Sequence, residues 1–155
     1  MDCMVDDQHF MDLALAQAAA AASMGEVPVG AVVVHEGRVI SQAHNRREVD
    51  ADPTAHAELI AMREAAAALG DWRLEECTVY VTLEPCAMCA GLMVNARVQR
   101  CVYGATDPRG GFLGTLGDLS SHSVLNHRFE VTAGVRAEES AEVLRTFFRK
   151  VRAKK

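Results

Sequence analysis

The sequence predicts an α/β protein with three layers, in which helices cover both faces of one mixed sheet of about five strands. Segments with helical periodicity alternate along the chain with short runs rich in β-branched residues. Two of these runs follow each other directly, which indicates a hairpin within the sheet. The chain has 155 residues, the usual size of one domain, and we expect residues 1–155 to form a single domain.

The first element is a predicted helix from about Asp7 to Met24, with Phe10 and Leu13 on one face and Gly25 after its end. Its Ala-rich run is too short to span a bilayer, and it follows an acidic segment where a signal peptide would be basic. We therefore expect a cytoplasmic protein that does not associate with a membrane.

The next elements are two strands and a second helix. The runs VPVGAVVV (27–34) and RVISQA (38–43) are joined by HEG and predict a hairpin. The polar loop 45–53 ends in Pro53, and a helix is predicted from about Thr54 to Leu69, ending at Gly70.

The second half of the chain continues the alternation. CTVYVTL (77–83) and RCVYGA (100–105) predict strands, and CAMCAGLMVNA (86–96) between them predicts a helix. A Gly-rich loop (107–118) precedes a last strand in RFEVTAGV (128–135), and residues 137–152 predict an amphipathic helix with acids early and bases late. We expect the order α-β-β-α-β-α-β-α(β)α, which places a further helix beside the last strand.

A pair of cysteines marks the predicted strand-to-helix junction. Cys86 and Cys89 form a C-x-x-C motif directly after Pro85. Residues three apart in a first helical turn lie on the same side, so both sulfurs can reach one ion. The helix N-terminus also favours the thiolate form. Taken alone, the motif fits half a zinc site, a redox pair or two core cysteines.

His56 supplies a distant partner for the two sulfurs, because it also lies in the first turn of a predicted helix. One imidazole and two thiolates suit Zn²⁺, and three protein ligands leave a position for water, as in catalytic sites. The alternative is a closed structural site with Cys3, Cys77 or Cys101 as fourth ligand. None of these three belongs to a motif of its own, and we expect none to bind the metal.

Glu58 follows His56 by two positions, and both side chains can lean over the open end of the helix. Zinc lowers the pKa of its bound water from about 15.7 to roughly 7. A nearby carboxylate can accept that proton and return it to a substrate, as general base and then general acid. A lone glutamate in a helix is usually a surface residue, but the position beside His56 favours the catalytic role.

H-A-E followed by P-C-x-x-C resembles the signature of the zinc-dependent nucleoside and nucleobase deaminases. EVPVGAVVV, HNR, DPTAHAE, VTLEPCAMCAG, YGATD and NHRFEV stand in the order found in the bacterial tRNA-specific adenosine deaminases, so the resemblance covers nearly the whole chain. It implies a cytidine-deaminase-like fold. It also implies conversion of adenosine to inosine at the wobble position of a tRNA anticodon, by a homodimer with one Zn²⁺ per subunit.

The resemblance also implies the roles of individual residues. His56, Cys86 and Cys89 would hold zinc, and Glu58 would be the proton shuttle. Hydroxide would attack C6 of the adenine while Glu58 protonates a ring nitrogen, and ammonia would leave.

Three further residues match substrate-binding positions of the family. Asn45 would contact the flipped nucleotide, Val29 would form an apolar wall of the base pocket, and Asp107 would lie close to the sugar. Without the family match, Asn45 is a turn residue, Asp107 a turn or cap ahead of Pro108, and Val29 a core residue.

The net charge of −5 argues against a uniformly basic nucleic-acid surface, but the last eleven residues, RTFFRKVRAKK, carry six bases and no acid. Such a block is often a solvated helix end. The family role favours a tRNA-facing surface instead. Phe147 or Phe148 would lie beside the phosphate-binding charges of Arg149, Lys150 and Arg152, with one phenylalanine in the core. Arg46 and Arg47 would add phosphate contacts from another side.

Two alternative functions stay open at this point. The first is a deaminase of a free base or nucleoside, such as guanine or cytosine, which would share both zinc motifs. The second is a non-catalytic zinc module that binds RNA or a partner protein, which would require a fourth protein ligand.

Overall fold

The computed structural model describes residues 3–154, with side chains described from residue 6 onward. Cys3 as a possible ligand and Lys155 of the basic tail therefore lie outside the described side chains. The elements are α1 (Cys3–Ser23), β1 (Gly30–His35), β2 (Arg38–His44), α2 (Ala57–Leu69), β3 (Cys77–Leu83), α3 (Ala87–Asn95), β4 (Arg100–Ala105), β5 (Glu130–Thr132) and α4 (Ala137–Ala153).

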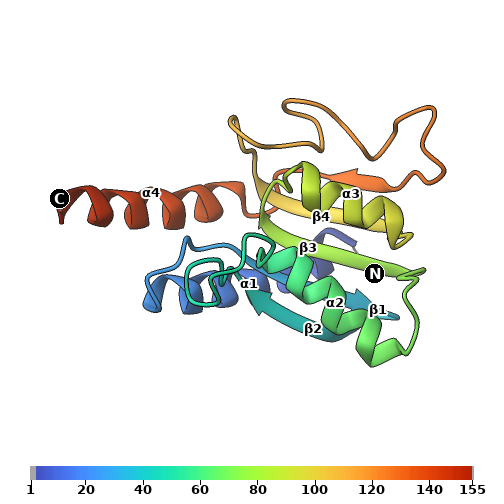
Figure 1. Ribbon diagram of the computed structural model, residues 1–155, viewed down its shortest axis with the longest axis horizontal. Coiled ribbons are helices and arrows are strands. Elements are labelled where there is room, and N and C mark those ends of the chain that lie inside the picture. The colour runs from blue at the N-terminus through green and yellow to red at the C-terminus, as the bar shows by residue number, and fades with distance from the viewer. Residues whose placement is uncertain (1–2, 155) are drawn as a thin grey trace.

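The strands form one mixed sheet in the order β2-β1-β3-β4-β5 (Figure 1). β1 is antiparallel to both β2 and β3, whereas β3, β4 and β5 run parallel to one another. The hairpin and the two strands predicted over 77–83 and 100–105 are present at those positions. The predicted mixed five-stranded α/β sheet is confirmed.

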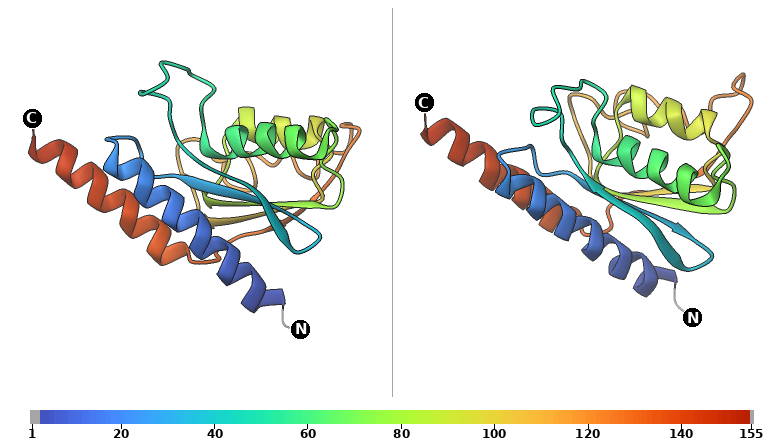
Figure 2. Two further views of the ribbon diagram at one scale, coloured as in Figure 1. Left: turned by 90° about the horizontal axis from the view of Figure 1, so that it is seen from below. Right: turned by 60° about the horizontal axis from the view of Figure 1, so that its bottom comes forward.

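Helices cover the two faces of the sheet in pairs, with α2 and α3 on one side and α1 and α4 on the other (Figure 2). Alternate residues of β1 enter the two cores. Ala31 and Val33 lie in the cluster beneath α2 and α3, and Val32 and Val34 lie in the cluster beneath α1. This period of two explains why residues 31–34 of β1 are all apolar, since both faces of the strand are buried there.

α1 extends further toward the N-terminus than predicted, beginning at Cys3. Met11, Ala14 and Ala18 are fully buried against the sheet. Asp7 joins this helix to the sheet, accepting hydrogen bonds from the Tyr80 hydroxyl at 2.8 Å and from Arg100 at 2.9 and 2.6 Å. Within residues 3–154, no helix has both the length and the apolar character needed to cross a bilayer.

The predicted order was wrong between the last two strands, where residues 106–129 contain no helix. Pro108 and four glycines within 110–117 disfavour a helix there. The last strand is also shorter than predicted, covering Glu130–Thr132 only. Gly134, with φ +86°, ends it by turning the chain back, and its N–H donates to the Tyr103 carbonyl.

Gly30 lets β1 approach the backbone of α1, because a Cβ at this position would collide with Ala14 and Ala18. Gly30→Ala should therefore lower the free energy of unfolding by about 1–3 kcal/mol, as overpacked sites do. Gly91→Ala, in α3 with no atom near the added Cβ, should raise it by about 0.5–1 kcal/mol. Urea unfolding measures both, and equal stability of the two variants would contradict the close approach.

Candidate active site

Two helices, α2 and α3, begin at the same end of the sheet, and each is preceded by a residue with extended backbone. His56 precedes α2 with φ −81° and ψ 149°, and Cys86 precedes α3 with φ −76° and ψ 176°. Neither side chain caps its own helix, so both are free to face the space between the helix ends. α2 begins at Ala57 and not at Thr54, because the Thr54 amide and hydroxyl both donate to Asp52 in a turn.

The His56 imidazole meets the two cysteines in this space. Its Nδ1 lies 3.6 Å from Cys86 Sγ and 3.6 Å from Cys89 Sγ. Two ligands of one tetrahedral Zn²⁺, at about 2.3 Å for sulfur and about 2.0–2.1 Å for nitrogen, lie about 3.6 Å apart. The three side chains therefore fit a zinc ion in both chemistry and spacing.

Among the described side chains, no fourth His, Cys, Asp or Glu joins this group within ligand distance. Cys77 and Cys101 are fully buried within β3 and β4. The group can thus hold a metal ion and leave a coordination position for another molecule, which is the arrangement of catalytic zinc sites.

The two thiols share a hydrogen bond that shifts their pKa values in opposite directions. A hydrogen bond from Cys89, strengthened by one from His56, lowers the pKa of the Cys86 thiol to about 3 against the effect of burial. The same bond, together with burial, raises the pKa of Cys89. These shifts favour the thiolate at Cys86, and Cys89 would release its proton on binding a metal ion.

Glu58 lies in the first turn of α2 and is only 4% exposed. Burial raises the pKa of its carboxyl group to about 7. A carboxyl group with such a pKa can both accept and donate a proton near neutral pH.

A pocket of about 770 Å³ opens above this group, and its lining includes His56, Glu58 and Cys86. Val29, Asn45 and Asp107 also line it, so the substrate-binding positions suggested by the sequence lie beside the candidate metal ligands. Cys89 is fully buried and does not line the pocket.

Asn45 and Asp107 also make the local bonds expected of turn residues. The Asn45 side chain accepts from the Arg47 amide at 3.3 Å and donates to the Val27 carbonyl at 3.3 Å. Asp107 accepts from the Arg109 amide at 3.0 Å. These two side chains therefore shape the pocket wall as well as lining it.

The C-terminal helix forms one side of the pocket through Leu144, Arg145, Phe148, Arg149 and Arg152. The neighbouring Phe147 and Lys150 face a separate groove between α1 and α4, together with Ala19 and Ala22. The two phenylalanines thus point to different sides of α4. Neither lies in the core, because Phe147 is only partly buried in the groove and Phe148 is 42% exposed, so the predicted core position of one of them was wrong.

On the other side of the pocket, Arg47 lines the opening. Arg46 is paired with Asp50 at 3.0 Å and is not part of the lining.

The pocket residues that the sequence did not predict include Leu83, Glu84, Thr106 and Arg109. Leu83 and Glu84 directly precede the P-C-x-x-C motif, and this adjacency was the available signal. Glu84 is 2% exposed, and hydrogen bonds from Thr115, Asp107 and Leu113 outweigh its burial and lower its pKa. Arg109 lies in the Gly-rich loop, where no periodic pattern indicates which side chains face a site.

Comparisons with known proteins agree with this geometry. A family model described as MafB19-like deaminase matches residues 5–152. The tRNA-specific adenosine deaminase of Bacillus subtilis is 49% identical over 98% of this chain and 94% of its own length. That of Agrobacterium fabrum is 46% identical over 96% of this chain and 98% of its own length.

A solved structure from work on A-to-I editing by tRNA A34 deaminases at the wobble position matches this fold with a TM-score of 0.85. Its sequence is 46% identical, and the match covers 88% of this chain and 99% of that one. The chain therefore belongs to the MafB19-like deaminases and, among them, to the tRNA-specific adenosine deaminase family.

Proposed function

We propose that this protein is a zinc-dependent hydrolase that converts adenosine to inosine at the wobble position of a tRNA anticodon, with release of ammonia. The observation that carries the proposal is the joint placement of His56, Cys86 and Cys89 with the buried Glu58 at one pocket. The names of relatives at 45–49% identity support the same substrate.

His56, Cys86 and Cys89 would hold one zinc ion per chain, which when bound supplies a water with its pKa lowered to about 7. Glu58 accepts a proton from the attacking water and delivers it to the adenine ring nitrogen. A C–O bond forms at C6. The proton of the new hydroxyl group passes to the amino nitrogen, the bond from C6 to that nitrogen breaks, and the products are inosine and ammonia. Because Glu58 is only 4% exposed, its carboxyl group is largely shielded from bulk solvent.

The pocket wall would bind the nucleotide from several sides. Val29 and Leu83 offer apolar contacts to a base, and Asn45 and Asp107 offer polar atoms beside them. Arg149 and Arg152 lie further out along α4, exposed at the rim. A free base has no phosphate for these arginines to bind, so the rim favours a polynucleotide over a free base or nucleoside.

A non-catalytic zinc module is the weaker interpretation, since no fourth ligand closes the site among the described side chains.

Homodimerisation and a cytoplasmic location stay predictions. A measurement of the mass of the protein in solution would test homodimerisation. One surface for the second copy is the partly exposed side of α3, where Met88 is 37% exposed.

The central test is inosine formation in a synthetic anticodon stem-loop. The purified protein should form inosine, and Glu58→Ala should lower kcat by about 100-fold or more, because the proton shuttle is lost. Zinc content and the unfolding midpoint should not change in the variant. Faster turnover of free guanine or cytosine than of the stem-loop would overturn the proposed substrate, and full activity of Glu58→Ala would overturn the proposed role.

Zinc dependence has its own test. Cys86→Ala should lose the metal and the activity, because an imidazole and a single thiolate hold zinc too weakly. Cys77→Ala is the matched control, since it removes a fully buried thiol outside the ligand group. Metal content by atomic absorption should fall only in the first variant. Loss of zinc from Cys77→Ala would show that a fourth sulfur closes the site.

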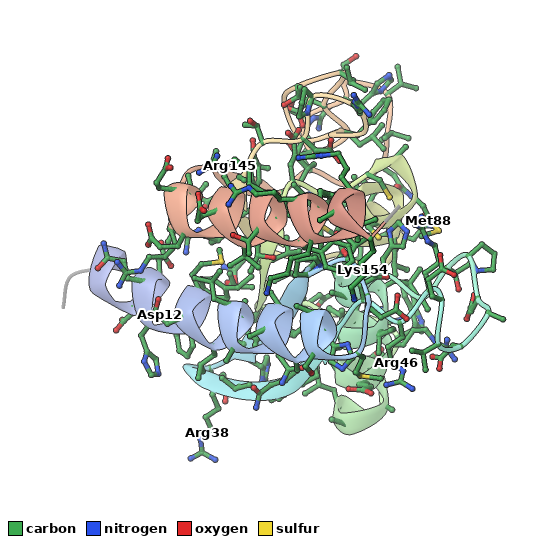
Figure 3. All side chains as sticks on the ribbon, turned by 90° about the vertical axis from the view of Figure 1, so that its left-hand side faces the viewer. Asp12, Arg38, Arg46, Met88, Arg145 and Lys154 are labelled. Atoms are coloured by element: carbon green, nitrogen blue, oxygen red, sulfur yellow. The ribbon has the colours of Figure 1, made fainter. Side chains whose placement is uncertain are left out.

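The arginine rim predicts a salt-dependent substrate affinity. In Arg149→Ala/Arg152→Ala, the slope of log(kcat/KM) against log(salt) for the stem-loop should become less steep by about 1 to 2. Arg38→Ala is the control, because Arg38 projects from the hairpin on the far side of the molecule from α4 (Figure 3). An identical slope in wild type and double variant would refute phosphate binding at the rim.

A further inference from the structure

Glu84 places a buried carboxylate between the metal-binding motif and the irregular segment 106–119. One oxygen accepts from the Asp107 amide at 3.0 Å and from the Thr115 hydroxyl. The other accepts from the Leu113 amide at 3.1 Å and from the Thr115 amide at 3.1 Å. A carboxylate has about four acceptor sites, so these donors leave none free for a substrate.

The segment that Glu84 holds lacks regular secondary structure. Its own backbone hydrogen bonds are few, and one more, from the Phe112 amide to the Pro85 carbonyl at 2.9 Å, ties it to the motif. Between Thr106 and Leu119 the chain forms turns and one isolated bridge, Leu113 with Asp118. At Gly111 the segment passes so near the motif that a Cβ would collide with the Glu84 carboxylate. The glycine therefore makes room for the carboxylate, and the carboxylate supplies acceptors for the amides of Asp107, Leu113 and Thr115.

The same segment carries a wall of the pocket. Thr106, Asp107, Pro108 and Arg109 all line it. The Asp107 amide, which donates to Glu84, belongs to the residue whose side chain faces the pocket. A displacement of the segment from Glu84 would thus move this wall relative to the candidate metal ligands.

We propose that Glu84 is a positioning residue, which acts on substrate binding by holding residues 107–115 against the end of β3. This inference rests on the proposed function, because it needs a nucleotide that contacts Asp107 and Arg109. Glu84 itself touches no reacting atom. Its loss would lower the fraction of molecules with the pocket wall in place, and substrate binding would restore that arrangement.

Glu84→Gln tests the proposal with little change in size. The amide nitrogen of glutamine would face two donors in place of an acceptor oxygen, so at least two bonds would be lost. If the competent fraction falls to about one tenth, KM for the stem-loop rises about tenfold while kcat at saturation is kept. Zinc content should equal that of the wild type, and the amides of Asp107, Leu113 and Thr115 should exchange hydrogen faster.

Asp7→Asn is the matched control. Asp7 is likewise a buried carboxylate with short hydrogen bonds, but it lies on the α1 side of the sheet and does not line the pocket. The Asp7→Asn variant should have a lower unfolding midpoint and an unchanged KM for the stem-loop. Thr115→Val removes the hydroxyl bond alone and should raise KM about two- to threefold, so it decides the question even if Glu84→Gln does not fold.

Three results would overturn the positioning role. The first is an unchanged KM in Glu84→Gln or, where that variant does not fold, in Thr115→Val. The others are loss of zinc from a folded Glu84→Gln and the same rise in KM in Asp7→Asn. Loss of zinc would show that Glu84 serves the metal ligands instead. Absence of inosine with the wild-type protein would refute the proposed function, and the exchange rates of the three amides would still report whether Glu84 holds the segment.

Discussion

The distance between one imidazole and two sulfurs depends on how closely α2 and α3 approach the same sheet. α2 buries only small or flexible side chains apart from Glu58: Ala57, Ala61, Met62 and Ala65. Such a helix lies close to its strands, and the Ser41 hydroxyl of β2 donates to the Ala61 carbonyl at 2.7 Å across this contact. A bulkier face would lift the start of α2 away from Cys86 and open the ligand group.

Site residues that lie close together in the sequence were predictable, because their spacing corresponds to one turn of a helix. The C-x-x-C pair and H-A-E each lie at a helix start, and the strands Cys77–Leu83 and Arg100–Ala105 match the runs that predicted them. The two phenylalanines of α4 also separated as helical periodicity requires, since neighbouring residues lie about 100° apart around the axis.

Contacts to backbone amides were not predictable. Glu84 binds amides 23 to 31 residues further along the chain, and any residue except proline supplies an amide. Glu26 is similar. It is fully buried, and its carboxylate accepts from the amides of Glu48 and Val49 on the opposite side of the pocket. In the sequence, nothing distinguishes Glu84 or Glu26 from an ordinary acidic residue on the surface.

The C-terminal helix is anchored at one end only. Ser140 is its one buried residue among those described, and it packs on Gly104 of β4 so closely that a Cβ there would collide with it. From Phe148 to Lys154 the side chains are exposed, and the helix projects beyond the edge of the sheet (Figure 1). Changes in these outer turns should carry little cost in folding free energy. If Arg149 and Arg152 bind phosphate as proposed, substitutions there can alter substrate preference without destabilising the fold.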